Sequence, residues 1–383
     1  MDWRESVGRL RMGMIGGGPG AFIGPVHRIA AEMDREIELV AGVFSSDADR
    51  SRKAALDYNI DPQRGYPDLE TMLSAERDRD DGMDFVAVVT PNHNHLPSAR
   101  AALDAGFPVM SDKPMTATLA EAEELAAVVE GAGLLYGLTF TYTGYPLVRE
   151  MRERIASGAI GTLRKVVVEY PQGWLAREAE GKQAEWRLDP ERAGAGGCIG
   201  DIGVHAFNLA EFVTGQRVSE VLPDLAAVVP GRALDDDCTV LLRFENGMRG
   251  VLLASQIEVG ELNGLRIRVY GEDGGMVWQQ ETPNTVTWHK IDGTTQLLRA
   301  GDASLSNAAQ SRTRTPGGHP EGYLEAFANI YRDFAAALRG EDAPMLPGLE
   351  EGMRSMLFID TCVRANAAGA GWTDLPRNER TSA

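Results

Sequence analysis

The chain has 383 residues, of which 43% are hydrophobic and 25% charged, so it can build two soluble domains with separate cores. Its net charge of −18 argues against binding to nucleic acid or to an anionic membrane surface. Three cysteines that lie far apart fit neither a disulfide framework nor a zinc site. Because there is no signal-peptide pattern and no run of about 18 apolar residues, we expect a cytoplasmic protein that holds no metal.

The start of the chain predicts a dinucleotide-binding turn. The segment MGMIGGGPGA (12–21) indicates an apolar strand that runs into the pattern G-x-G-x-x-G/A. A helix at 25–33 and a second apolar strand at 36–44 provide the βαβ context that the pattern requires. Glycines here allow a tight turn and place a pyrophosphate at the helix N-terminus. The residues expected to contact the dinucleotide are Gly16, Gly18, Pro19, Ala21, Phe22 and Ile23.

Strands and helices continue to alternate up to about residue 142, which predicts a parallel, doubly wound sheet. We expect further helices at 47–58, 67–76, 96–105 and 118–131, and strands at 84–90, 107–111 and 134–140. Ligands of such sheets bind at the carboxyl ends of the strands. His93 and His95 follow a strand and belong to this rim rather than to a metal pair. The other residues expected there are Ser45, Ser46, Thr90, Pro91, Asn92, Asp112 and Lys113.

The end of the second strand leaves the choice of cofactor open. The acidic residue that usually ends it in NAD-binding domains is replaced by Phe44-Ser45-Ser46-Asp47. Serines, or Asp47 if the turn bends back, would bond a ribose hydroxyl. Arg50, Arg52 and Lys53 just beyond would instead suit a 2′-phosphate. The residues alone do not separate NAD from NADP.

Residues 143–383 predict a second domain with a large, mostly antiparallel open sheet. A helix at 145–158 is followed by a series of short strands, and Asn246-Gly247 and Asp292-Gly293 are strong hairpin turns. Helices at 322–339 and 348–368 close the chain. The loop 300–321 is long and polar, and a loop of that length more often carries function than serves as a connector.

The segment GAGGCIGDIGVH (194–205) combines a glycine-rich loop with the start of a helix. Asp201 and His205 are four residues apart, so on a helix they share one face. An imidazole ordinarily titrates near neutral pH and suits acid–base chemistry. Taken alone, Asp201 could equally be a helix N-cap and His205 a core or surface residue.

Four motifs in this order resemble the glucose–fructose oxidoreductase / inositol dehydrogenase (Gfo/Idh/MocA) family: GGGPGA, TPNHNH, SDKP where the family usually has EKP, and WR…GAGGCIGDIGVH. The resemblance covers nearly the whole chain. It implies a Rossmann domain, an open-sheet substrate domain and a homo-oligomer packed through the sheets, for which we expect a tetramer. It implies Lys113, Asp201 and His205 as the catalytic set, and Trp186 and Arg187 near the nicotinamide or its phosphate.

The sequence departs from the family at Asp112, which stands in place of the common glutamate. The carboxylate is one methylene shorter and should still accept a ribose hydrogen bond. The segment GHPEGY (318–323) and the opening GGGPGAFIG resemble the branch that acts on cyclic polyols and sugars. Relatives in that branch mostly use NAD, so we expect NAD rather than NADP.

The resemblance implies oxidation of a secondary hydroxyl of an inositol (scyllo or myo) or of an aldose such as glucose, including L-glucose, to the ketone or lactone. His205 suits the base and Lys113 the stabilisation of the alkoxide, while Asp201 would bond a substrate hydroxyl or hold Lys113. The residues expected to contact substrate are Lys113, Tyr142, Trp174, Arg177, Asp201, His205, His319 and Tyr323.

Two other functions compete with this one. Some family members are glycoside hydrolases that keep NAD bound and work through a 3-keto sugar. A non-catalytic nicotinamide sensor is the other, and the presence of Lys113, Asp201 and His205 argues against it, because a sensor does not need a proton-transfer set.

Overall fold

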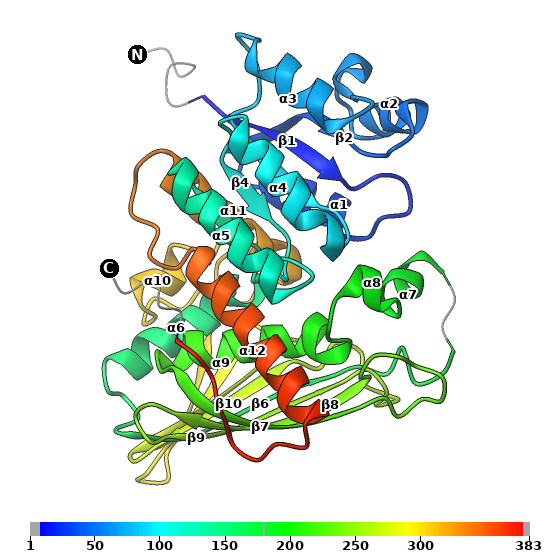
Figure 1. The fold of residues 1–383 in the computed structure, drawn as a ribbon. Helices are drawn as coiled ribbons and strands as arrows, with labels where there is room; N and C mark the ends of the chain where they lie inside the picture. Colours follow the sequence, from blue (N-terminus) through cyan, green and yellow to red (C-terminus); the bar gives the residue numbers. More distant parts are fainter. Residues whose placement is uncertain (1–7, 179–180, 378–383) are drawn as a thin grey trace. The chain divides into compact units, whose positions relative to one another are not determined.

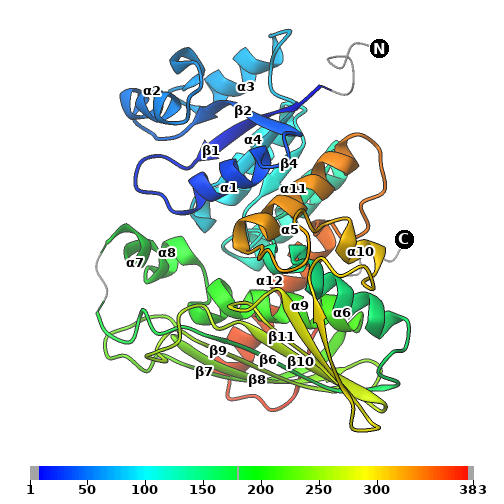
Figure 2. The same ribbon diagram turned by 180° about the vertical axis from the view of Figure 1, so that it is seen from behind.

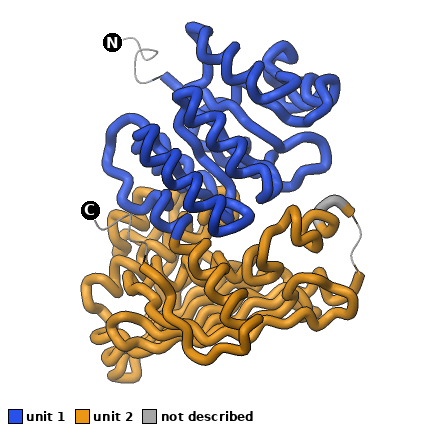
Figure 3. Tube along the Cα trace, viewed as in Figure 1, with its two compact units in different colours: residues 1–139, 327–353 blue, residues 140–326, 354–383 orange. Residues whose placement is uncertain are grey.

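The computed structural model describes residues 8–178 and 181–377. The chain forms two compact units, one of residues 1–139 and 327–353 and the other of residues 140–326 and 354–383 (Figure 3). The sequence places one boundary after residue 142, whereas in the structure the chain also returns to the first unit at residues 327–353. Helices α11 (Tyr323–Leu338) and α12 (Leu349–Ala367) each belong partly to both units, so nothing in their sequence pattern reveals the division.

The first unit contains a five-stranded parallel sheet in the order β2-β1-β3-β4-β5 (Figure 1). Its central strand β3 is buried along its whole length, as its run of apolar residues predicts. The strand order reverses between β1 and β3, and ligands of doubly wound sheets bind outside the carboxyl ends at such a point. The strands are β1 (Leu10–Gly16), β2 (Ile37–Val43), β3 (Phe85–Val89), β4 (Val109–Ser111) and β5 (Tyr136–Leu138).

In helices α2, α3 and α5 of this unit, a side chain caps the N-terminus. Asp47 and Asp68 cap α2 and α3 by accepting the N–H groups of Arg50 and Thr71. Thr118 and Glu121 form the reciprocal capping box of α5 that the segment TLAE indicates. The helices are α1 (Ile23–Glu32), α2 (Ala48–Asp57), α3 (Leu69–Arg77), α4 (His95–Asp104) and α5 (Leu119–Ala132), with short 3₁₀ turns at Pro62–Arg64 and Asn92–Asn94.

The second unit is built on a nine-stranded sheet in the order β13-β12-β11-β10-β6-β9-β8-β7-β14 (Figure 1). All neighbours are antiparallel except β6 and β9. Asn246-Gly247 joins β8 to β9 and Asp292-Gly293 joins β12 to β13, as predicted. The strands are β6 (Leu163–Pro171), β7 (Val218–Ala226), β8 (Asp237–Phe244), β9 (Arg249–Ser255), β10 (Arg266–Gly271), β11 (Gly274–Gln279), β12 (Thr285–Lys290), β13 (Thr295–Arg299) and β14 (Thr373–Asp374).

Helices cover one face of this sheet (Figure 2). Helix α9 (Val204–Thr214) packs on β6, β9 and β10, and α6 (Pro146–Ala156) packs on β11, β12 and α9. The rings of Phe207 on α9 and Phe358 on α12 stack at a centroid distance of 4.1 Å. The shorter helical segments are Thr141–Gly144, α7 (Lys182–Arg187), α8 (Pro190–Ala193), a π-helical turn at Ile199–Gly203 and α10 (Asn307–Gln310), the last within the predicted loop 300–321.

The predicted fold class is therefore confirmed: an α/β Rossmann domain followed by an α+β domain with a large, mostly antiparallel sheet. Within residues 8–178 and 181–377, no helix is both long and apolar enough to span a membrane. The same residues contain no cluster of three or more histidine, cysteine or acidic side chains that could hold a metal ion.

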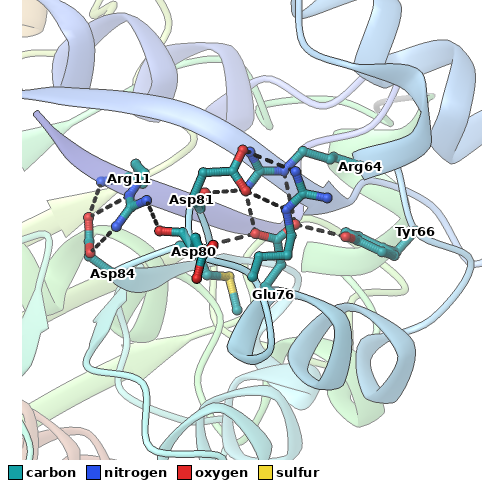
Figure 4. Close-up of polar contacts among 9 residues, drawn as sticks. Arg11, Arg64, Tyr66, Glu76, Asp80, Asp81 and Asp84 are labelled. Carbon is teal, nitrogen blue, oxygen red and sulfur yellow. Dashed lines mark hydrogen bonds and ion pairs between the residues drawn. The ribbon is translucent and has the colours of Figure 1, made fainter.

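A buried ion pair fixes the outer part of the first unit (Figure 4). Arg64 donates to Glu76, with Nε 2.9 Å from Oε1, and the Glu76 side chain is completely buried. The hydroxyl of Tyr66 donates to the same oxygen at 2.8 Å, and the backbone N–H of Met83 donates to the other at 3.2 Å. One carboxylate thereby ties α3 to the segments before and after it.

We expect Glu76→Gln to lower the free energy of unfolding by about 3–5 kcal/mol, because it removes the buried counter-charge of Arg64 and leaves only the more distant, exposed Asp81 carboxylate at 3.7 Å. Urea titration followed by circular dichroism measures the change. The matched control is Glu38→Gln, which breaks the solvent-exposed pair with Arg9 and should cost less than about 1 kcal/mol. Equal losses for the two variants would contradict the assignment.

Candidate active site

The turn after β1 brings backbone close to the neighbouring strands. Gly16 has a φ of +96°, and a Cβ there would lie 2.8 Å from the carbonyl oxygen of Val89. A Cβ at Gly18 would overlap the carbonyl oxygen of Phe44. Helix α1, which begins after this turn, has no side-chain cap; neither does α4, whereas α2, α3 and α5 have one. The first N–H groups of α1 suit the oxygens of a pyrophosphate, so this turn fits a dinucleotide.

In the turn after β2, the Asp47 carboxylate caps helix α2. The Asp47 carboxylate accepts the N–H of Arg50 at 2.8 Å, and the N–H of Asp47 donates to the Ser45 hydroxyl at 3.2 Å. Ser46 is exposed beside them. Of the basic residues that follow, Arg52 donates to Asp49 at 3.1 Å. The hydroxyls of Ser45 and Ser46 remain our prediction for ribose contacts.

Asp112 follows β4 and meets groups from several segments of the first unit. Its Oδ1 accepts the N–H of Lys113 at 2.8 Å and the hydroxyl of Thr139 at 2.9 Å. Its Oδ2 lies 3.9 Å from Nε2 of His27, a residue that the sequence analysis missed. Burial alone would raise the pKa of Asp112, but the interaction with His27 and the charge of Lys113 outweigh burial and hold the pKa well below its usual value.

His95, predicted on the cofactor rim, is fully buried and bridges two loops. Its Nδ1 lies 2.8 Å from the carbonyl oxygen of Pro114 and its Nε2 lies 2.9 Å from that of Thr90. Burial lowers the pKa of the ring. His95 thus connects the loop after β3, which carries the predicted Thr90, Pro91 and Asn92, to the turn that carries Lys113.

In the second unit, Asp235 clamps the glycine-rich loop. Its carboxylate accepts the N–H groups of Gly197 at 2.7 Å and Ile199 at 2.8 Å, and its carbonyl accepts that of Cys198. A Cβ at Gly197 would overlap this carbonyl oxygen, so the approach requires glycine. The helix then opens with the π-helical turn 199–203, and its capping positions are Cys198 and Gly203 rather than Asp201.

The Asp201 side chain accepts hydrogen bonds from Arg187 and Gln256. Its Oδ2 accepts Nε of Arg187 and Nε2 of Gln256, each at 3.0 Å. The guanidinium of Arg187 also lies over the ring of Trp186, 4.3 Å from its centroid. Gln256, only 3% exposed, was missed by the sequence analysis, although a polar residue directly after the apolar strand β9 was the available signal.

His205, 8% exposed, lies among aromatic rings of the second unit. The ring of Tyr142 meets it edge-on at a centroid distance of 4.8 Å, and those of Phe140 and Tyr170 lie about 6 Å away, at 6.0 and 6.3 Å. The structure therefore joins the predicted residues Tyr142 and His205 in one cluster. The sequence analysis missed Tyr170 because it lies in an apolar strand, β6, where a tyrosine is expected to pack in the core.

A chain of polar groups leads away from this cluster. The hydroxyls of Tyr142 and Tyr170 are hydrogen-bonded to each other, and that of Tyr170 donates to Asn263 at 2.7 Å. Gln172 donates to the same amide oxygen at 3.0 Å and accepts the indole N–H of Trp174 at 2.9 Å. The predicted Trp174 is thus linked to the cluster through Gln172 and Asn263, which the sequence analysis missed.

The remaining predicted substrate residues lie elsewhere in the second unit. Arg177 and His319 are exposed, and Nδ1 of His319 lies 3.2 Å from the carbonyl oxygen of Pro316. Tyr323 opens α11 and lines an open hollow of about 700 Å³. The hollow is also lined by polar and aromatic residues that include Tyr145, Gln280, Thr282, Asn284 and Glu321.

A doubly wound parallel sheet with an uncapped glycine turn, followed by a domain with a large open sheet, defines a two-domain dinucleotide-binding protein. Residues 10–140 match the oxidoreductase family with an NAD-binding Rossmann fold, and residues 148–277 match the GFO/IDH/MocA C-terminal domain. The chain belongs to the Gfo/Idh/MocA family and is an NAD-binding oxidoreductase.

Several known proteins are similar over almost their full length. The uncharacterized oxidoreductase YfiI of Bacillus subtilis is 34% identical, over 95% of this chain and 96% of its own. An oxidoreductase structure from Sinorhizobium meliloti is 43% identical, with a TM-score of 0.87 over 95% of this chain and 99% of that one. An inositol dehydrogenase homolog from Azotobacter vinelandii, complexed with NADH and myo-inositol, is 33% identical, with a TM-score of 0.89 over 96% and 97%.

We expect Gly18→Ala to weaken NAD binding by about tenfold or more, equivalent to about 1.4 kcal/mol, because the added methyl group would displace the turn from Phe44. Titration calorimetry with NAD measures this. Gly131→Ala is the control, since a Cβ there meets no atom within 4 Å and the position lies inside α5. Unchanged NAD affinity in Gly18→Ala would show that the dinucleotide does not use this turn.

Proposed function

We propose that this protein is an NAD-dependent dehydrogenase that oxidises a secondary hydroxyl of a cyclic polyol or sugar, an inositol or an aldose, to the ketone or lactone. The observation that carries the proposal is the polar chain beside His205, in which Tyr142, Tyr170 and Asn263 supply hydroxyl and amide groups. A polyhydroxylated ring needs such groups for orientation, and an apolar alcohol does not. The inositol dehydrogenase homolog to which the chain is similar supports the same class of substrate.

The proposed chemistry divides among three side chains of this protein. NAD, when bound, supplies the acceptor for the hydride. His205 takes the proton of the reacting hydroxyl, Lys113 stabilises the negative charge that develops on its oxygen, and Asp201 accepts a hydrogen bond from a substrate hydroxyl. Arg187 and Gln256 support this role of Asp201 because they hold its carboxylate in one orientation.

We further assign substrate contacts to Trp174, Arg177, His319 and Tyr323, together with Tyr142. The side chain of Trp174 is 41% exposed while its N–H is held by Gln172, so its ring can stack on the apolar face of a sugar. Tyr323 belongs to a hollow with both polar and aromatic walls, which suits a ring that carries several hydroxyls.

We also propose a homo-oligomer, a tetramer, packed through the sheets of the second unit. One face of the sheet is covered by α6 and α9. On the other face, directly paired residues of neighbouring strands form a row of mostly apolar side chains. No described helix of this unit lies on that face (Figure 1). The row consists of Leu222, Leu241, Val251, Val167, Arg268, Val277, Thr287 and Leu297.

The compartment that we propose is the cytoplasm. Cys198, Cys238 and Cys362 are free thiols, and all three are buried. Burial raises the pKa of Cys198 and of Cys362 well above the usual value, which keeps these groups as thiols and suits structural rather than redox roles.

A panel of inositols and of D- and L-aldoses tests the function directly. With NAD, we expect absorbance of the reduced cofactor to accumulate with at least one unsubstituted polyol or sugar. Cleavage of glycosides without net reduction of NAD would favour the hydrolase instead. NAD binding with no turnover of any polyol, sugar or glycoside would favour the nicotinamide sensor.

We expect Lys113→Ala and His205→Ala to lose about 10²–10⁴-fold in kcat while they still bind NAD, because each removes a group that acts on the reacting hydroxyl. Steady-state kinetics with the best substrate of the panel, together with NAD titration, measure both quantities. His289→Ala, at an exposed histidine on β12, is the control and should keep the normal kcat. Normal turnover in a folded Lys113→Ala or His205→Ala variant would remove that residue from the mechanism.

A further inference from the structure

A buried chain of side chains in the first unit leads from α11 to Asp112. The hydroxyl of Tyr331 lies 2.7 Å from Nδ1 of His27, and Nε2 of His27 lies 3.9 Å from Oδ2 of Asp112. His27 on α1 is completely buried and Tyr331 is 1% exposed. At 3.9 Å the His27–Asp112 contact is electrostatic rather than a hydrogen bond.

The proton positions in this chain follow from burial. Burial raises the pKa of Tyr331 well above its usual value, and the charge of Asp112 adds to the effect, so Tyr331 remains a neutral phenol. When its single proton is donated to Nδ1 of His27, the proton of the imidazole ring is on Nε2, the nitrogen that faces Asp112. The ring thus presents a positive edge to the carboxylate.

Asp112 passes this effect on to Lys113. Its Oδ2 faces His27, while its Oδ1 accepts the N–H of Lys113 and the hydroxyl of Thr139. The ionised carboxylate accepts these two hydrogen bonds more strongly than a protonated carboxyl would, because its oxygens carry the negative charge. The backbone from which the Lys113 side chain extends is therefore tied to the ionisation state of Asp112.

The groups that face Asp112 come from several elements. His27 on α1, Lys113 on the same turn and His95 on α4 all favour the charged form, and they act against burial. Thr139 donates from the segment after β5, and Tyr331 on α11 acts through His27.

We propose that His27 and Tyr331 are positioning residues: they keep Asp112 ionised and oriented, and through it they place Lys113 for alcohol oxidation. The inference rests on the proposed function for the role of Lys113, but the control of Asp112 by His27 does not depend on it. A purely structural role is the competing explanation, because the His27 ring also packs edge-on against Phe327 at a centroid distance of 4.7 Å.

Four variants of the full chain separate these explanations. His27→Leu removes the ring nitrogens, and Tyr331→Phe removes only the hydroxyl that orients them. His27→Gln retains an N–H donor that can reach toward Asp112 and serves as the conservative rescue. Phe327→Leu disturbs the packing around His27 without touching the polar chain and is the matched control.

The first readout is the pH dependence of kcat. In His27→Leu we expect the step of the acid limb that Asp112 sets, below the step set by His205, to move up by at least about one pH unit, a tenfold change in the proton affinity of Asp112, because one of the groups that offset burial is gone. Tyr331→Phe should shift it in the same direction by less, and His27→Gln should restore most of the profile. Phe327→Leu should lower the melting temperature and leave the acid limb in place.

The second readout does not require substrate. NMR titration of the aspartate carboxyl carbons, with the Asp112 signal assigned by its loss in Asp112→Asn, follows the ionisation of Asp112 directly. An Asp112 that titrates at the same pH in His27→Leu as in the natural chain overturns the inference. So does an equal shift of the acid limb in Phe327→Leu and His27→Leu. A shifted Asp112 titration in a chain that oxidises no alcohol would support the control by His27 and overturn only the role of Lys113.

Discussion

A buried carboxylate needs hydrogen-bond donors to replace the water it has lost. This requirement fixes the loops that carry the residues of the proposed chemistry. Asp112 accepts the backbone of the Lys113 turn, and Asp235 accepts two N–H groups of the glycine-rich loop. Glu76 does the same for the segment around α3. Each acid accepts backbone N–H groups, so each fixes the path of a loop and not only one contact.

The two acids near the proposed catalytic residues meet this requirement in different ways. Asp112 has neighbours that favour its charge, and its pKa lies well below the usual value. Asp235 relies on backbone N–H groups, and burial raises its pKa in spite of them. As the pH falls, Asp235 should therefore take up its proton at a higher pH than Asp112. The loop before Asp201 should lose its support at a higher pH than the turn that carries Lys113.

In the second unit, aromatic rings surround the proposed base His205, and side-chain amides join the tyrosine hydroxyls in one hydrogen-bonded network. Tyr142 and Tyr170 surround His205, while Asn263 and Gln172 extend the hydrogen bonding to Trp174. Side chains that hold one another before a ligand arrives lose little freedom on binding, which favours selection among ring stereoisomers by hydroxyl position. The motif that identifies the family lies beside this network, but residues from three separate strands and loops complete it.

The sequence by itself determined the fold class, the order of the elements and most of their bounds. Alternating strands and helices up to β5, the glycine turn after β1, the capping box at Thr118 and the hairpin glycines at 247 and 293 are local patterns, and local backbone preferences decide them. The matched family confirms the Rossmann fold that these patterns predict. The assignment of Lys113, Asp201 and His205 came from motif resemblance and stays a prediction.

Only the tertiary structure decided which distant side chains support those motifs. His27 meets Asp112 and Tyr331 across separations of 85 and 304 positions, and Gln256 meets Asp201 across 55. Each of these supporting residues taken alone has an ordinary pattern: a histidine inside a helix, a tyrosine on an amphipathic helix, a glutamine after a strand. Their roles arise from pairing between elements that fold far apart in the chain, and no local periodicity encodes such pairing.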